Sequence, residues 1–254
     1  MENPIRIKPD KNFYTIYKYD ELESTNNFIK NNIESLKDYT VIWGNKQSSG
    51  RGRFSRKWIS IGGKDLTFSI LLPLSSLKPC NWPNTTQITA LCIAELLEDY
   101  MRSVRIKWPN DILVNNKKIC GILCEIIKRK RSNGVIVGIG LNVNSSAHDL
   151  SCIDQPATSI WCESCIEMNR QELLIKLIDR FLHSFSILAQ HGFSFFKNKI
   201  SEKLAFKKRD IVLSEGEKKY SGRIIDIDDN GSLKFLCSNG IIRNFYSGEL
   251  STFS

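Results

Sequence analysis

A nine-residue stretch from Gly50 to Trp58, called the basic loop here, carries an unusual density of anion-binding groups. It reads GRGRFSRKW, with two glycines, three arginines, one lysine and a tryptophan. Guanidinium forks bind phosphate or carboxylate, and glycines that adopt positive φ could turn backbone N–H groups inward around an anion. Trp58 offers a flat face to a planar heterocycle. The loop therefore suggests a nucleotide site, although a mobile basic surface loop explains it equally well in isolation.

A second polar stretch, KWPND at residues 107–111, has residue types typical of a turn and lies between two runs of strand-forming residues. The following Asn115–Asn116 turn returns the chain as a hairpin. These turns present Lys107, Asp111 and Lys118 as titratable groups, each of which could also be an ordinary solvated turn residue. Gly121, inside an apolar strand, indicates close approach by a ligand or another backbone, or a β-bulge.

Two further groups of polar residues and glycines stand at the ends of predicted strands. Ser24 and Thr25 separate a strand-like run from a helix-like run, where spacing alone favours simple helix capping. The run GIGLN at 138–142 would clear space on a strand for a ligand and offers the amide of Asn142. No third glycine opens a helix after it, so a Rossmann dinucleotide site is not expected.

Hydrophobic periodicity predicts the elements that position these residues. Apolar runs predict strands at 14–19, 40–44, 66–72 and 135–143. Helical spacing predicts a helix that follows Ser24 and includes Phe28, Ile33 and Leu36, a second over 86–101, and a third that opens at Asn169 and ends near Gly192. Together they predict an α/β domain of the α+β type, with a mixed β-sheet covered by helices.

From residue 210 onward the pattern changes to short strands, at 211–213, 222–227, 233–236 and 241–246. Turns at Glu215–Gly216, Asn230–Gly231 and Asn239–Gly240 separate them. Roughly forty-five residues with such turns fit a compact barrel. We therefore predict two domains, residues 1–206 and 207–254.

Composition excludes some classes of protein without naming a partner. The 254-residue chain has 41% hydrophobic residues, enough for a core, and a net charge of +9 that is scattered along its length. The sequence shows neither a signal peptide nor a membrane span, so a cytoplasmic protein with reduced thiols is expected. Cys162 and Cys165 have metal-like spacing, but no second Cys/His pair follows at zinc-finger distance, and no metal site is predicted.

In this arrangement the sequence resembles the biotin protein ligases from Glu23 to the end of the chain. The resemblance rests on five motifs in order: Ser24-Thr25-Asn26; Gln47 with Gly50-Arg51-Gly52-Arg53, Arg56 and Trp58; KWPND at 107–111; Lys118 with Gly121; and GIGLN at 138–142. It implies a class II synthetase-like catalytic domain with a small C-terminal SH3-like barrel. Lipoate ligases and octanoyl transferases share this fold, but their own arginine- and glycine-rich signature is not evident.

The resemblance also implies a reaction. ATP and biotin would form biotinyl-AMP and pyrophosphate, with Mg²⁺ assisting the triphosphate, and a lysine of a biotin carboxyl carrier protein, such as an acetyl-CoA carboxylase subunit, would then take the biotin. By resemblance, biotin contacts Ser24, Thr25, Gln47, Gly50, Arg51, Lys118 and Gly121. The adenylate side comprises Arg53, Arg56, Trp58, Asn110 and Asn142. Lys118, Arg51, Arg53 and Asp111 would carry the chemistry, with Lys118 bridging biotin's carboxylate and the phosphate and Asp111 orienting the incoming lysine.

Two departures from the family pattern matter. About twenty residues precede Ser24, too few for the helix-turn-helix domain of the two-function members, so neither repression nor specific DNA binding is expected. Ser55 stands where the family loop usually has glycine. A lipoate ligase is the nearest alternative and a nucleic-acid-binding module a more distant one. The sequence does not settle which carrier is used or whether the protein is a monomer or a homodimer.

Overall fold

A computed structural model describes residues 5–7, 13–130 and 133–252 and contains two β-sheets. The first has eight strands in the order β1-β2-β3-β4-β8-β7-β6-β5. Its central strands β4 and β8 are buried on both faces, although β4 includes the polar residues Thr67 and Ser69. All neighbours pair antiparallel except β2 and β3, which run parallel. The bounds are β1 Ile5–Ile7, β2 Thr15–Leu22, β3 Thr40–Gln47, β4 Leu66–Pro73, β5 Val104–Lys107, β6 Asp111–Val114, β7 Lys117–Ile127 and β8 Gly134–Leu141.

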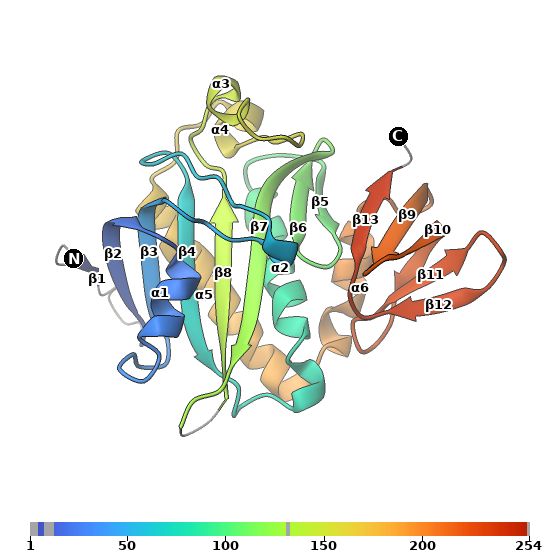
Figure 1. Ribbon diagram of the computed structural model, residues 1–254, viewed down its shortest axis with the longest axis horizontal. Coiled ribbons are helices and arrows are strands. Elements are labelled where there is room, and N and C mark those ends of the chain that lie inside the picture. The colour runs from blue at the N-terminus through green and yellow to red at the C-terminus, as the bar shows by residue number, and fades with distance from the viewer. Residues whose placement is uncertain (1–4, 8–12, 131–132, 253–254) are drawn as a thin grey trace.

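Helices cover both faces of this sheet (Figure 1). Helix α1 (Thr25–Asn31) packs on one face against β3, β4 and β8, and α2 (Asn84–Leu97) packs on the other against β5, β6 and β7. The long α5 (Arg170–His191) then covers α2, and its apolar stripe from Leu173 to Leu188 is buried. The basic loop crosses in front of β8 and β7 on the same face of the sheet as α1.

The second sheet belongs to the small SH3-like barrel and lies beyond β5 and β6 in Figure 1. Its strands follow the order β12-β11-β10-β9-β13, and every pairing is antiparallel. Helix α6 (Ser194–Lys203) joins the two parts, because it contacts both β5 and β10. The bounds are β9 Asp210–Glu215, β10 Lys218–Ile227, β11 Leu233–Cys237, β12 Ile242–Phe245 and β13 Glu249–Thr252.

Most predicted elements are present, with differences at their ends. The first helix stops at Asn31 because the Asn32 side chain donates to the Phe28 carbonyl (2.9 Å). Ile33 and Leu36 lie beyond the end of the helix but still pack against the small cluster around Ile29. Their helical spacing therefore reflected burial and did not indicate how far the helix extends. Four short elements were not predicted: β1, β13, α3 (Ala147–Leu150) and α4 (Ile160–Ser164).

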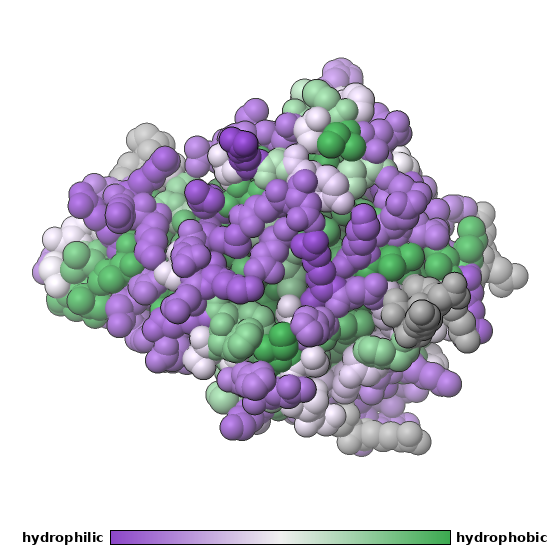
Figure 2. Space-filling view, turned by 180° about the vertical axis from the view of Figure 1, so that it is seen from behind, coloured by the Kyte–Doolittle hydropathy of each residue, from purple (hydrophilic) through white to green (hydrophobic). Residues whose placement is uncertain are grey.

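Seen from the α5 side, the surface is mostly hydrophilic, with apolar residues gathered at the barrel's end (Figure 2). All eight cysteines lie in the described part of the chain and are free thiols. Burial raises the pKa of Cys92 and of Cys124 to about 12, so both thiols stay protonated and unreactive at neutral pH. Within residues 5–7, 13–130 and 133–252, no helix combines the length and apolarity needed to cross a bilayer.

Candidate functional site

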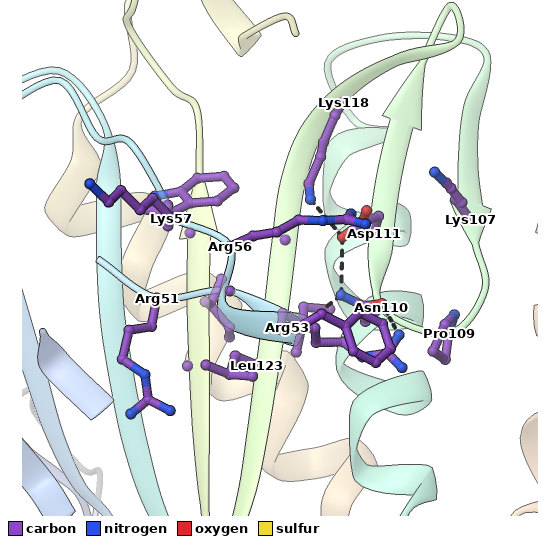
Figure 3. A pocket seen from close by; sticks show the side chains of 18 of the residues that line it. Arg51, Arg53, Arg56, Lys57, Lys107, Pro109, Asn110, Asp111, Lys118 and Leu123 are labelled. Atoms are coloured by element: carbon purple, nitrogen blue, oxygen red, sulfur yellow. Dashed lines mark hydrogen bonds and ion pairs between the residues drawn. The ribbon is translucent and has the colours of Figure 1, made fainter. Parts of the chain in front are cut away.

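The basic loop, α1, the 107–111 turn and the barrel meet around one pocket on the α1 face of the large sheet (Figure 3). We divide its wall in two. The neutral side consists of Ser24, Thr25, Asn26 and Gln47, with Ser69 behind them. The charged side consists of Arg53, Arg56, Lys107, Asn110, Asp111, Lys118 and the barrel residues Gly248 and Glu249.

The neutral side is a closed hydrogen-bond network at the start of α1. Ser24 is the N-cap residue of this helix, and its Oγ accepts from the Asn27 amide (3.5 Å). The Thr25 amide and hydroxyl both donate to Gln47 Oε1, at 2.8 and 3.1 Å. An amide at a helix start has no partner within the helix, so Gln47 satisfies an otherwise unpaired donor. Capping and pocket lining, which the sequence left as alternatives, therefore occur together.

Asn26 connects this network to the sheet. In the sequence it stood out only as the third residue of the Ser24-Thr25-Asn26 motif. Its Oδ1 accepts from Ser69 (2.5 Å), and its Nδ2 donates to Glu125 Oε2 (2.9 Å). A Cβ on Gly138 would lie 2.2 Å from Asn26 Oδ1. The glycine that was expected to clear space for a ligand therefore clears space for Asn26.

Arg51 lies with the neutral side and not beside the other two arginines. Figure 3 shows its side chain pointing away from Asp111 and Lys118. Its guanidinium donates to Asn27 Oδ1 (2.5 Å) and forms an ion pair with Glu125 (3.1 Å). Since Glu125 also holds Asn26, this carboxylate ties the first turn of α1 to the start of the basic loop. No motif in the sequence pointed to Glu125.

The basic loop folds back on itself, and its glycines act differently from the prediction. The Gly52 amide donates to the Arg56 carbonyl (2.8 Å) and the Trp58 amide to the Gly50 carbonyl (2.9 Å). Neither glycine has positive φ; instead, a Cβ on Gly50 would lie 2.4 Å from the Trp58 carbonyl oxygen. Positive φ occurs at Phe54 (54°) and Ser55 (60°). Close backbone approach, not turn geometry, requires Gly50.

On the charged side, three groups converge around Asp111. Lys118 Nζ lies 2.9 Å from Asp111 Oδ1, and both side chains are largely buried, at 17% and 13% exposure. Asn110 Nδ2 donates to the same oxygen (3.1 Å), while its Oδ1 accepts from Arg53 (2.8 Å). Burial lowers the pKa of Arg53, and the nearby Asp111 charge opposes that shift. Asp111 therefore holds Lys118 and Asn110 directly, and Arg53 through Asn110.

The barrel contributes directly to this side. The Gly248 carbonyl accepts from Arg53 (3.3 Å), and Glu249 forms an ion pair with Arg56. The hydrogen bond from Arg56 lowers the pKa of the Glu249 carboxyl, although burial works in the opposite direction. Burial also lowers the pKa of Lys107, which faces the same group of charges. The sequence gave no indication that Gly248 and Glu249 belong to the site.

Trp58 occupies the floor of the pocket. A Cβ on Gly140 would lie 2.2 Å from its ring, and one on Gly121 would lie 3.1 Å from it. Lys118 Nζ lies 5.9 Å from the ring centroid, and the buried indole N–H has no hydrogen-bond partner among the residues that the structure describes. The space left open is about 90 Å³, whereas ligand pockets usually measure about 300–1,000 Å³. A nucleotide therefore enters only if Trp58 and the loop shift.

Eleven of the thirteen residues singled out from the sequence line the pocket: Ser24, Thr25, Gln47, Arg51, Arg53, Arg56, Trp58, Asn110, Asp111, Lys118 and Gly121. Gly50 and Asn142 are not among the lining residues. Asn142 is buried, its Nδ2 donates to the Thr158 carbonyl (2.8 Å), and its Oδ1 has no partner. Among the described residues, no group of three or more His, Cys, Asp or Glu side chains could hold a metal ion.

Known proteins resemble this chain in sequence and in fold. The biotin/lipoate A/B protein ligase family matches residues 19–142, a span that contains every lining residue named above except those of the barrel. The bifunctional ligase/repressor BirA of Escherichia coli strain K12 is 28% identical over 232 residues, which are 91% of this chain and 71% of that protein. The biotin--[acetyl-CoA-carboxylase] ligase of Paracoccus denitrificans is 28% identical over 195 residues, 74% of this chain and 80% of that one.

A solved structure supports the same assignment over both sheets. The biotin protein ligase from Aquifex aeolicus, in complex with biotin and ATP, superposes with a TM-score of 0.81 at 29% identity and covers 93% of this chain and 97% of its own. The chain therefore contains a biotin/lipoate A/B protein ligase domain over residues 19–142, and it is similar across both sheets to biotin protein ligases.

Proposed function

We propose that this ligase activates biotin as biotinyl-AMP and then transfers it to a lysine of a biotin carboxyl carrier protein. The observation that carries the proposal is the division of one pocket into a neutral and a charged side, with Lys118 over the floor between them. A neutral network of donors and acceptors suits a ureido ring, and a cluster of cations suits the carboxylate and phosphates that must meet.

In the first step, a biotin carboxylate oxygen attacks the α-phosphorus of ATP, and pyrophosphate leaves. Both reactants are anions, so the main barrier that side chains can lower is their repulsion. Lys118 would contact the carboxylate and the α-phosphate together, once it exchanges its contact with Asp111 for the substrates. Arg53 and Arg56 would bind the phosphates from the barrel side, while Thr25 and Gln47 hold the ureido ring.

In the second step, the ε-amine of a carrier lysine attacks the acyl carbon of the mixed anhydride, and AMP leaves. The amine must be neutral to attack, so a nearby carboxylate that accepts its proton or orients it would help. Asp111 is placed for this role, because it lies at the same mouth and is released when Lys118 turns to the substrates. The carrier would be an acetyl-CoA carboxylase subunit or a related protein.

Mg²⁺ would accompany the triphosphate and neutralise part of its charge. This cation is usually held by one or two carboxylates together with substrate phosphates. The pocket offers Asp111 and Glu249, and both are ion-paired with basic side chains. This donor set fits a cation that arrives with ATP better than one that resides in the protein.

One assay separates the candidate activities. Pyrophosphate release is measured from ATP with biotin, with lipoate or with neither, followed by transfer of labelled biotin to a carrier domain. We expect release with biotin and acid-stable label on the carrier lysine. Release with lipoate instead would make the protein a lipoate ligase.

We further propose that residues 1–206 form the catalytic domain and 207–254 the barrel, and that the protein acts in the cytoplasm, where ATP and carboxylases are available. Specific DNA recognition is not part of the proposal. Weak, salt-sensitive binding to DNA of any sequence is expected from the net charge of +9. A mobility shift at a discrete site that strengthens with biotin would contradict this.

A further inference from the structure

A turn of the barrel packs against the catalytic part of the chain, with Gly231 buried and Asn230 exposed. The Gly231 carbonyl accepts from Gln87 Nε2 (2.6 Å) and from Trp108 Nε1 (3.3 Å). The neighbouring Asn230 carbonyl accepts from Asn84 Nδ2 (3.0 Å). All three donor side chains are at most 6% exposed. A buried donor that loses its partner is costly, so these side chains hold the turn in one position.

The contact also leaves no room for variation at Gly231. Its φ is +85°, and a Cβ there would lie 2.2 Å from Asn84 Nδ2 and 2.4 Å from Gln87 Oε1. The turn is closed internally as well, since the Gly231 amide donates to the Asp228 carbonyl (2.9 Å). Its shape therefore does not depend on the contact, and it can act as a rigid support.

What the turn supports is the 107–111 segment. Trp108 is held by Gly231, and two residues later the Asn110 side chain binds both Arg53 and Asp111. The Asn110 amide donates to the Lys107 carbonyl (3.2 Å), and its carbonyl accepts from the Ile122 amide (3.0 Å), which fixes the segment on β7. A shift of Trp108 would therefore move the groups that set the charged side.

We propose that the Asn230–Gly231 turn is a positioning element for adenylation: through Trp108, it holds Asn110 and Asp111 where Arg53 and Lys118 need them. The inference rests on the proposed function for its kinetic readout, although the structural coupling is independent of that activity. The side chains that bind the turn are Asn84, Gln87 and Trp108, and none of them belongs to the neutral side. Biotin recognition should therefore be insensitive to the turn.

The test compares two glycine-to-alanine variants in the same barrel. Gly231→Ala adds both strain and a clash, whereas Gly240→Ala adds the same strain at φ +82° with no atom within 4 Å of the new Cβ. We expect Gly231→Ala to lower kcat for biotin-dependent pyrophosphate release about tenfold or more, with little change in the KM for biotin. Gly240→Ala should stay within about twofold of wild type.

Hydrogen exchange of the peptide spanning residues 105–123 provides the second measurement, which needs no activity. It should be faster in Gly231→Ala than in Gly240→Ala, and also faster in Gln87→Met, which removes one donor to Gly231 and keeps the volume. Equal exchange in the two alanine variants would overturn the inference. Faster exchange with unchanged kcat would also overturn it, because the turn would then not serve catalysis. Should wild type release no pyrophosphate with biotin, the proposed function fails instead, and exchange alone decides the coupling.

Discussion

The neutral and charged sides of the pocket are built by different means. The neutral side is buried, and its partners come from α1 and from β3, β4 and β7 of the large sheet beneath that helix. The charged side is partly exposed, and its partners come from the basic loop, the 107–111 turn and the barrel. Rigid neighbours preform the first side, whereas the second depends on contacts between separate parts of the chain. In the proposed function, biotin recognition thus falls to the part of the site that is preformed, and phosphate binding to the part that depends on contacts between separate segments.

The largest effect is expected on the charged side, from a substitution of Lys118. Lys118→Ala should slow adenylate formation about 100-fold or more, because it removes a preorganised cation from the reacting centre. It should leave the KM for biotin much less affected, because the neutral side stays intact. The measurement is biotin-dependent pyrophosphate release under single-turnover conditions. Lys117→Ala removes an exposed lysine from the adjacent position and serves as the control. A wild-type rate in Lys118→Ala would remove it from the mechanism.

The neutral side is tested by Thr25→Val, which keeps the side-chain shape and removes the hydroxyl that donates to Gln47. A lost buried hydrogen bond costs about 1–3 kcal/mol, so we expect the KM for biotin to rise about tenfold while the KM for ATP stays within twofold. Thr89→Val is the matched control, since its hydroxyl donates within α2 to Thr85. If both KM values rise together, the two sides are not separate.

The adjustable character of the basic loop is tested at Ser55, where φ is +60°. A serine in this region costs on the order of 1 kcal/mol, and glycine removes that strain while it adds about 0.5–1 kcal/mol of entropy to the open loop. The relief of backbone strain is slightly larger than the added entropy of the open loop, so Ser55→Gly should slow release of biotinyl-AMP by a factor of a few. Dissociation is followed by chasing labelled adenylate. Ser49→Gly controls for added flexibility. Faster release from Ser55→Gly would show that entropy dominates.

The smallest effect concerns the ion pair between the loop and the barrel. The pKa of Glu249 lies below its ordinary value of 4.5, so the pair stabilises the fold fully above that pH and loses its contribution as pH falls through the lowered pKa. Both partners are partly exposed, which limits the gain to about 0.5 kcal/mol. Urea unfolding of wild type and Glu249→Gln should therefore differ slightly at pH 7 and coincide at low pH. A difference that grows toward low pH would contradict this sign.

The sequence predicts the two sides unequally. Ser24 and Thr25 could be placed at a helix start because capping and periodicity are local signals. Gln47 and Arg51 were assigned to the biotin side only through the family resemblance. The partner of Arg51 could not be predicted, because Glu125 is 74 residues away and lies on another strand. Glu249 was missed for the same reason: no local pattern tells which turn of a barrel will face Arg56. Gly121, Gly138 and Gly140 are positions of close approach, but the neighbouring groups are the side chains of Trp58 and Asn26, and the positive φ predicted for the loop glycines was wrong.

The Trp58 side chain occupies space in the pocket that a ligand over Gly140 would need. Its ring fills the surface above Gly140, and among the described residues nothing accepts a hydrogen bond from its buried indole N–H. A ligand that lies over Gly140 must displace the ring, so the free energy of the ring's contacts with Gly121 and Gly140 is subtracted from the affinity of that ligand.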